Sequence, residues 1–177
     1  MIQRLEPVVE RIAMGLAIAG GGVLLAIVAL TCVSIAGRVF VPLDIGIGPI
    51  RGIYDITEIG MAAAVFAFLP WTQLREAHAT VDLFQSALPG VADRVLQFLF
   101  HAGMLAVAGF GTWRLYLGML DKYAYGETTI IAGIPVWLGY LAGLMGAVGF
   151  VLVAAFCVLR GGARLAHHAP SVPASTD

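Results

Sequence analysis

Residues 128–159 read TTIIAGIPVWLGYLAGLMGAVGFVLVAAFCVL, a run of 32 residues without Asp, Glu, Lys or Arg. A helix needs about 20 apolar residues to cross the hydrocarbon core of a bilayer, so this run is long enough for one span. Three further stretches carry no charge, namely 12–37, 59–74 and 95–113. All 10 basic and 11 acidic residues lie outside the four stretches. This segregation predicts four transmembrane helices.

The composition excludes several classes of protein. The 177 residues suffice for one domain, and they are 60% hydrophobic and only 12% charged. A soluble domain is about 45–50% apolar and about 25% charged, so a free-standing soluble protein is excluded. The net charge of −1 gives no basic field for nucleic acid. Cys32 and Cys157 lie inside apolar stretches, which argues against a disulfide framework or a metal site.

We expect a single membrane domain with spans at about 12–37, 53–73, 93–116 and 133–159 and a disordered tail at about 162–177. The first span is read as retained, because Glu6 and Glu10 precede a run longer than a signal-peptide core. Asp55 followed by Glu58 resembles a capping box at the start of the second span.

Two segments have the pattern of amphipathic helices at the membrane surface. Residues 2–11 predict a short interfacial helix that leads into the first span. Between spans two and three, apolar residues recur at helical spacing over about 75–89, and Arg75, His78 and Asp82 share another face. The predicted fold is therefore an all-α membrane protein with four transmembrane helices plus an amphipathic interfacial helix.

The basic residues predict an orientation. Six of them lie in the N-terminal segment, the second connection and the tail, and four lie in the first and third connections. Because cytoplasmic segments carry an excess of Lys and Arg, both termini are predicted to be cytoplasmic.

The candidate chemical groups each have a structural alternative. His78 and Asp82 could be two metal ligands or an acid/base pair, but no third ligand is nearby, which favours a solvated polar stripe. His101, the one histidine inside a span, could relay protons or could be a hydrogen-bonded packing residue. Asp55 and Glu58 could bind a coupling cation, cap a helix, or pair with a basic residue of a partner protein.

Small residues form rows that allow close helix packing. Gly139, Gly143 and Ala147 form one row in the fourth span, and Gly15 and Ala19 form another in the first. The sequence leaves open whether these rows pack within the chain or against another membrane protein.

The spans contain no charge at mid-depth and no repeat, and both cysteines are in apolar stretches. A coupled transporter usually places charges, broken helices or repeats at the midplane. We therefore expect an accessory role, with no catalytic residue, metal or cofactor. The main alternative is a small self-contained transporter or channel acting as a homo-oligomer, and a membrane redox enzyme is a further one.

Three motifs resemble a known family. They are Tyr54-Asp55-Ile56-Thr57-Glu58, His78-Ala79-Thr80-Val81-Asp82-Leu83-Phe84, and Gly126-Glu127-Thr128-Thr129 followed by Ile134-Pro135-Val136-Trp137. With four spans, they are similar to the small (Q-type, DctQ-like) membrane subunit of tripartite ATP-independent periplasmic (TRAP) transporters. The resemblance covers roughly 50–160. One departure is Arg75-Glu76-Ala77, where a more basic, glycine-containing approach to His78 would be expected.

The resemblance implies functions that the composition does not. TRAP systems import organic acids with a sodium gradient, a periplasmic binding protein delivers the substrate, and a large membrane subunit carries it. The small subunit would be a non-catalytic scaffold in the bacterial inner membrane, with the 75–89 helix as a cytoplasmic-face brace. The candidate contacts with the large subunit are Asp55, Glu58, Arg75, His78, Asp82, Gly126, Glu127, Thr128 and Pro135. Those with the binding protein are Arg38, Asp44, Arg51, Asp121 and Lys122, together with Glu127.

Overall fold

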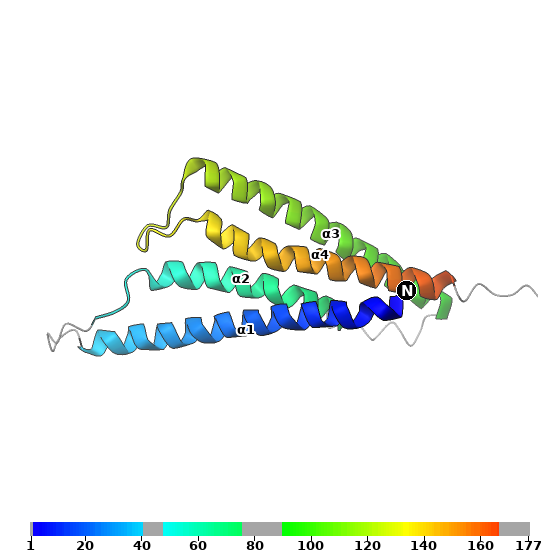
Figure 1. Ribbon diagram of the computed structural model, residues 1–177, viewed down its shortest axis with the longest axis horizontal. Helices are drawn as coiled ribbons and strands as arrows, with labels where there is room; N and C mark the ends of the chain where they lie inside the picture. Colours follow the sequence, from blue (N-terminus) through cyan, green and yellow to red (C-terminus); the bar gives the residue numbers. More distant parts are fainter. Residues whose placement is uncertain (1, 41–47, 76–89, 167–177) are drawn as a thin grey trace, which may run out of the picture.

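The described part of the chain consists of four long helices. The computed structural model describes residues 2–40, 48–75 and 90–166. Within these ranges lie α1 (Ile2–Phe40), α2 (Ile53–Leu74), α3 (Gly90–Tyr125) and α4 (Trp137–Ala166), as Figure 1 shows. Each helix contains a segment long and apolar enough to cross a membrane. The predicted all-α chain with four apolar helices is thus confirmed. Residues 76–89 of the predicted interfacial helix at 75–89, and the predicted tail from 167 onward, lie outside the described residues.

Three helices extend beyond the predicted spans. α1 begins at Ile2, so residues 2–11 continue directly into the first span instead of forming a separate helix. α3 runs past 116 to Tyr125, and α4 runs to Ala166, so 162–166 are helical. The last turns of α3 are held by α4, because Tyr123 packs edge-on against Trp137 at 5.6 Å between ring centroids.

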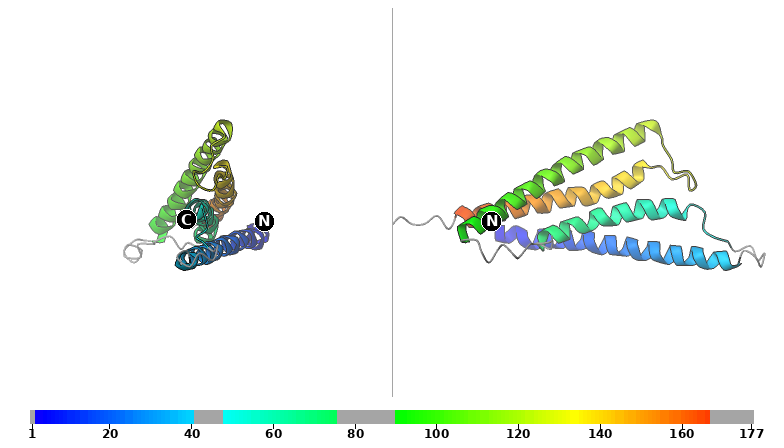
Figure 2. Two further views of the ribbon diagram at one scale, coloured as in Figure 1. Left: turned by 90° about the vertical axis from the view of Figure 1, so that its left-hand side faces the viewer. Right: turned by 180° about the vertical axis from the view of Figure 1, so that it is seen from behind.

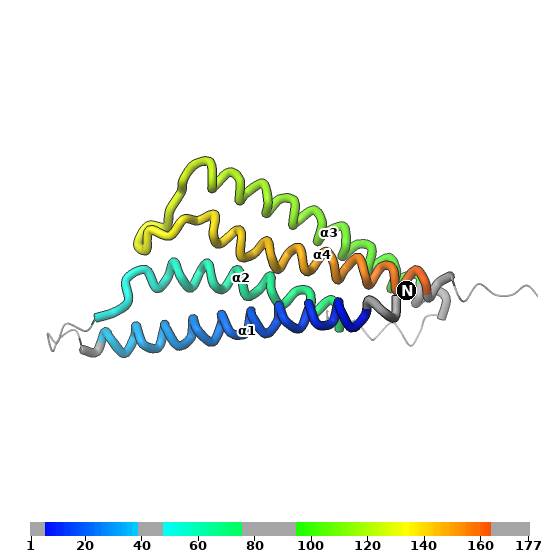
Figure 3. The backbone as a smooth tube through the Cα atoms, in the orientation of Figure 1, coloured from blue at the N-terminus to red at the C-terminus, as the bar shows by residue number. Residues whose placement is uncertain are grey.

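The helices lie side by side in the order α1, α2, α4, α3 (Figure 1). α4 packs against both α2 and α3, α2 packs also against α1, and α1 makes a smaller contact with α4. All four converge where α1 begins and α4 ends, and they spread apart toward the opposite end (Figures 2 and 3). We call the converging end the terminal end and the spread end the loop end.

The buried apolar core lies at the terminal end. It consists of side chains from α1, α2 and α4, namely Ala13, Leu74, Val153, Phe156 and Cys157. Val9 and Trp71 pack against this core. Three helices contribute to this core, whereas α3 packs mainly against α4. Large apolar side chains such as Leu25, Val107 and Phe110 stay exposed in the isolated chain. Because lipid is as apolar as these side chains, their exposure is expected on the outside of a membrane protein.

Small residues of α4 bring it close to its two neighbours. A Cβ at Gly139 would lie 3.2 Å from Ile59 of α2, and one at Gly143 would lie 3.3 Å from Phe66. A Cβ at Gly146 would lie 2.5 Å from the backbone carbonyl carbon of Phe66. Ala147 is 2% exposed. The row in α4 therefore packs within the chain, while Gly15 of α1 has open space around it.

Candidate functional site

The connection between α3 and α4 begins with a glycine that ends α3. Gly126 has a φ of +61°, a backbone conformation that glycine adopts without steric cost. Its N–H donates to the carbonyl of Tyr123 at 3.3 Å, and the N–H of Glu127 donates to the carbonyl of Lys122 at 3.4 Å. These two bonds form a Schellman motif, which satisfies the last carbonyls of the helix. The Glu127 carboxylate also pairs with the Lys122 ammonium.

The rest of this connection folds back on itself as a short hairpin, which we call the 127–136 hairpin. Thr128 and Pro135 form an antiparallel bridge. On either side of it, the N–H of Thr129 donates to the carbonyl of Ile134 at 2.9 Å, and the N–H of Val136 donates to the carbonyl of Glu127 at 3.0 Å. The Thr129 hydroxyl accepts the N–H of Ile134 at 3.1 Å. The Gly-Glu-Thr-Thr and Pro motifs therefore build one hydrogen-bonded unit.

Asp55 joins this hairpin to the start of α2. Its Oδ2 accepts the N–H of Ile131 at 3.1 Å and the N–H of Ala132 at 2.8 Å, across 76 and 77 residues of sequence. The hairpin comes so close that a Cβ at Gly52, which has a φ of +76°, would lie 2.6 Å from the Cβ of Ala132. Gly52 is the N-cap of α2 and provides no side-chain cap. The capping-box prediction for Asp55 is thus wrong, because its carboxylate binds the hairpin instead.

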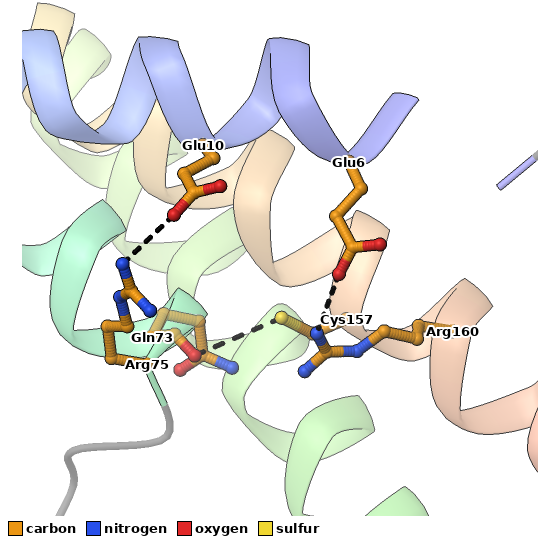
Figure 4. Close-up of polar contacts among 6 residues, drawn as sticks. All are labelled: Glu6, Glu10, Gln73, Arg75, Cys157 and Arg160. Atoms are coloured by element: carbon orange, nitrogen blue, oxygen red, sulfur yellow. Dashed lines mark hydrogen bonds and ion pairs between the residues drawn. The ribbon is translucent and has the colours of Figure 1, made fainter. Parts of the chain in front are cut away.

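At the terminal end, two ion pairs hold the first turns of α1 (Figure 4). Arg75 Nη2 lies 2.9 Å from Glu10 Oε1, and the same guanidinium lies 4.6 Å from the ring centroid of Trp71. Arg160 Nη1 lies 3.7 Å from Glu6 Oε1. The start of α1 is therefore fixed to the ends of α2 and α4. Arg75, a candidate for subunit contact, makes an intrachain contact here.

A buried polar group links α2, α3 and α4 close to the core. Gln73 is 1% exposed and His101 is 9% exposed. Gln73 Nε2 donates to His101 Nδ1 at 3.4 Å. The Cys157 thiol donates to the backbone carbonyl of Gln73 at 3.9 Å (Figure 4). His101 thus has the geometry of a hydrogen-bonded packing residue. Among the described residues, no group of three or more His, Cys, Asp or Glu side chains is placed to hold a metal ion.

Comparison with known protein families gives a match that covers most of the chain. The family model of the DctQ component of tripartite ATP-independent periplasmic transporters matches residues 27–164. The chain belongs to the DctQ family. No curated protein and no solved structure matches it. This DctQ chain is therefore a small membrane component of a TRAP transporter, which makes it part of a transport system in a membrane.

The family match includes the 127–136 hairpin, its anchor Asp55 and the basic partners Arg75 and Arg160, but not the acids Glu6 and Glu10. Glu58 lies one turn beyond Asp55 on the exposed surface of α2, and it has no hydrogen bond or ion pair within the described ranges. His78 and Asp82 fall outside the described residues. The structure therefore unites Asp55, Gly126, Glu127, Thr128 and Pro135 at the loop end, and places Glu58 beside them on the outer surface.

The charged residues proposed to meet a binding protein gather at the same end. Arg38 lies in the last turn of α1, and Arg51 lies in the turn before α2. Asp121 and Lys122 lie in the last turns of α3. Arg38, Arg51 and Asp121 are exposed, while Lys122 is partly covered and paired with Glu127. Asp44 lies outside the described residues.

Sequence reasoning missed two features of this DctQ chain. It gave no partner for Gln73, because a contact with His101 depends on how α2 and α3 pack. It also ended the third span at about 116, whereas α3 continues to Tyr125. The apolar residues 115–120 that follow Arg114 were the signal that could have shown this continuation.

The Arg75–Glu10 pair allows a test of the terminal end. Both side chains are about half exposed, at 54% and 45%, so replacing Arg75 by Gln should lower the free energy of unfolding by less than about 1 kcal/mol. The loss should shrink in high salt, which screens exposed charges. A double-mutant cycle with Glu10→Gln, measured by thermal unfolding in detergent, isolates the pair. The exposed Arg51→Gln at the loop end is the control, and a coupling of zero would show that the pair is not formed.

Proposed function

We propose that this chain is the non-catalytic scaffold of a TRAP transporter. It holds the large transport subunit in the inner membrane and helps to receive the periplasmic binding protein during sodium-driven uptake of an organic acid. The observation that supports this role best is the Asp55-anchored 127–136 hairpin, which fixes two segments 76 residues apart at the loop end. A rigid surface loses less conformational entropy on binding a partner than a mobile loop does.

The hairpin presents groups that a partner could contact. Ile130 at its tip is 98% exposed and Ile131 is 58% exposed, and the exposed Arg51 and Asp121 lie at the same end. Apolar groups with charges around them are typical of the centre and rim of a protein interface. In the proposed orientation the termini are cytoplasmic and the loop end is periplasmic, which agrees with the distribution of six basic residues against four.

The scaffold role is supported by how little of α3 is covered within the chain. α3 packs closely against α4, and its other sides expose Leu99, Val107, Phe110 and Trp113 in the isolated chain. Membrane helices associate through packing and interhelical polar contacts, so such a surface can meet either lipid or a second membrane protein. The proposed occupant of part of it is the large subunit.

Reconstitution tests this function directly. Proteoliposomes that hold the large subunit, this chain and the binding protein should take up solute when a sodium gradient is applied. Leaving out this chain should reduce uptake to the level of empty vesicles, because the large subunit would lose its support and its docking surface. Uptake by this chain alone would contradict the proposal and would support the homo-oligomeric transporter instead.

A further inference from the structure

The third helix carries a single charge within a long apolar segment. Residues 95–120 contain one charged side chain, Arg114, and the next charge is Asp121. Six residues without charge, 115–120, separate the two. Along a helix the seven-residue step corresponds to about 10 Å. Arg114 therefore does not lie at the edge of the apolar segment.

The packing of α3 on α4 gives the depth of Arg114. The Thr112 hydroxyl lies 3.4 Å from the carbonyl oxygen of Ala147, and a Cβ at Gly143 would lie 3.6 Å from Leu115. Gly143 and Ala147 lie in the charge-free segment of α4 between Trp137 and Leu159. They are six and ten residues beyond Trp137, or about 9–15 Å along the helix. Arg114 is thus about 10 Å inside the charge-free part of α4, counted from the loop end.

α2 can be compared with Arg114 through the same glycine. The Cβ position of Gly143 would also lie 3.3 Å from Phe66. Phe66 is more than halfway along α2, which runs from Ile53 to Leu74. Arg114 therefore lies level with the charge-free parts of α2 and α4 and inside the apolar layer, where a charged side chain is costly unless it is paired.

Within the chain Arg114 has no partner among the described residues, and its side chain is exposed. Along the same side of α3 lie Val107, which is 66% exposed, and Gly111, around which a Cβ would find open space. Positions 107, 111 and 114 follow helical spacing, so they share one face. This face is open to another helix, and it presents a cation inside the apolar layer.

The direction of the side chain disfavours a lipid phosphate as the partner. In an α-helix each Cα–Cβ bond tilts toward the N-terminus of the helix. The N-terminus of α3 is at the terminal end, so the Arg114 side chain starts away from the headgroups at the loop end, which are the nearer ones. It would have to turn back and cover about 10 Å to reach the level of Asp121.

A second copy of this chain is also a poor partner. In α2 of such a copy, the acids Asp55 and Glu58 lie at the start of the helix. This part of α2 is level with the start of α4, because a Cβ at Gly139 would meet Ile59. They are therefore at the loop end and not at the depth of Arg114. We infer that Arg114 pairs with a carboxylate on a transmembrane helix of the large subunit. The inference rests on the proposed function and names the contact that joins the two subunits.

Co-purification of the large subunit on tagged small subunit tests this contact. Arg114→Gln should reduce recovery of the large subunit by about tenfold or more, because it leaves a carboxylate unpaired in the membrane. Arg114→Glu should reduce it further, and Arg114→Lys should retain part of it, since Lys keeps the charge but not the bidentate geometry. Arg11→Gln, which changes an exposed arginine near the start of α1 at the terminal end, should recover the large subunit as the unchanged chain does.

The outcomes separate the two proposals. If the unchanged chain recovers no large subunit, the proposed function fails. If it does, and Arg114→Gln and Arg114→Glu recover equally much, the contact with Arg114 is disproved and the scaffold role stands. Native mass spectrometry tests for a lipid ligand. If the unchanged complex retains an anionic lipid and the intact Arg114→Gln complex does not, Arg114 binds a lipid and the inference is overturned.

A second measurement covers the case in which the Arg114 variants do not fold. A photo-crosslinking benzoylphenylalanine at the exposed Val107, in a chain that keeps Arg114, should form an adduct with the large subunit. The acidic partner is then found by changing each carboxylate in the spans of the large subunit to Lys, one at a time. One of these variants should restore co-purification with Arg114→Glu. Absence of the Val107 adduct in a complex that co-purifies would overturn the inference.

Discussion

Replacement of Gly146 by alanine is expected to lower the free energy of unfolding by about 1–3 kcal/mol, the usual cost of overpacking a helix contact. The new Cβ would lie 2.5 Å from the carbonyl carbon and 2.6 Å from the carbonyl oxygen of Phe66, and 2.8 Å from the nitrogen of Ala67. These are backbone atoms of α2, so no side-chain rotation can relieve the contact. The two helices must move apart, and the packing of α4 beside α2 must loosen with them.

Two matched variants show whether the cause is this close approach. Gly109→Ala in α3 adds the same methyl group where nothing lies within 4 Å, so it should leave stability unchanged or raise it by up to about 1 kcal/mol through helix propensity. Gly149→Ala would meet the end of the Leu16 side chain, which can turn away, and should have an intermediate effect. Thermal unfolding in one detergent measures all three. A Gly146→Ala protein that melts with the unchanged chain would contradict the packing.

The helices could be predicted because their signal is local. Charge-free stretches of the length of a bilayer specify a membrane helix without any knowledge of its neighbours. The ends of the helices were less predictable, because packing decides them. The third span was predicted to end at about 116, yet α3 continues to Tyr125, and Tyr123 packs on Trp137. The fourth span was predicted to begin at about 133, yet Pro135 forms a bridge with Thr128, and α4 begins at Trp137.

The candidate site could be predicted only as a set of residues and not as an arrangement. The motifs around Asp55 and Gly126 were found, but the bond between Asp55 and the hairpin crosses 76 residues and leaves no periodic signal. The capping box was a reasonable local interpretation of an acid at a helix start, and the hairpin overrode it. Glu6 and Glu10 were likewise noted only as acids before the first span, although they contact Arg160 and Arg75.

Replacement of Asp55 by alanine is expected to release the 127–136 hairpin from α2. The variant removes the acceptor of the Ile131 and Ala132 N–H groups, which are bound at 3.1 and 2.8 Å. Amide exchange at these two positions should become about tenfold faster or more, because exchange reports local opening. Exchange at Thr129 should change less, since its N–H is bonded within the hairpin to Ile134. Hydrogen exchange of the small subunit alone measures this effect without any assumption about partners.

The same variant links the hairpin to transport. A mobile hairpin must be ordered again when a partner binds, and this entropy cost weakens the encounter with a binding protein. Uptake by the complete Asp55→Ala system should therefore fall at limiting binding protein and recover as the binding protein is raised. Glu58→Ala, one turn along α2, is the control for exchange, because its carboxylate has no partner within the described part of the chain. Unaltered exchange in Asp55→Ala would disprove the anchor. Faster exchange with unaltered uptake would keep the anchor and remove the hairpin from the docking surface.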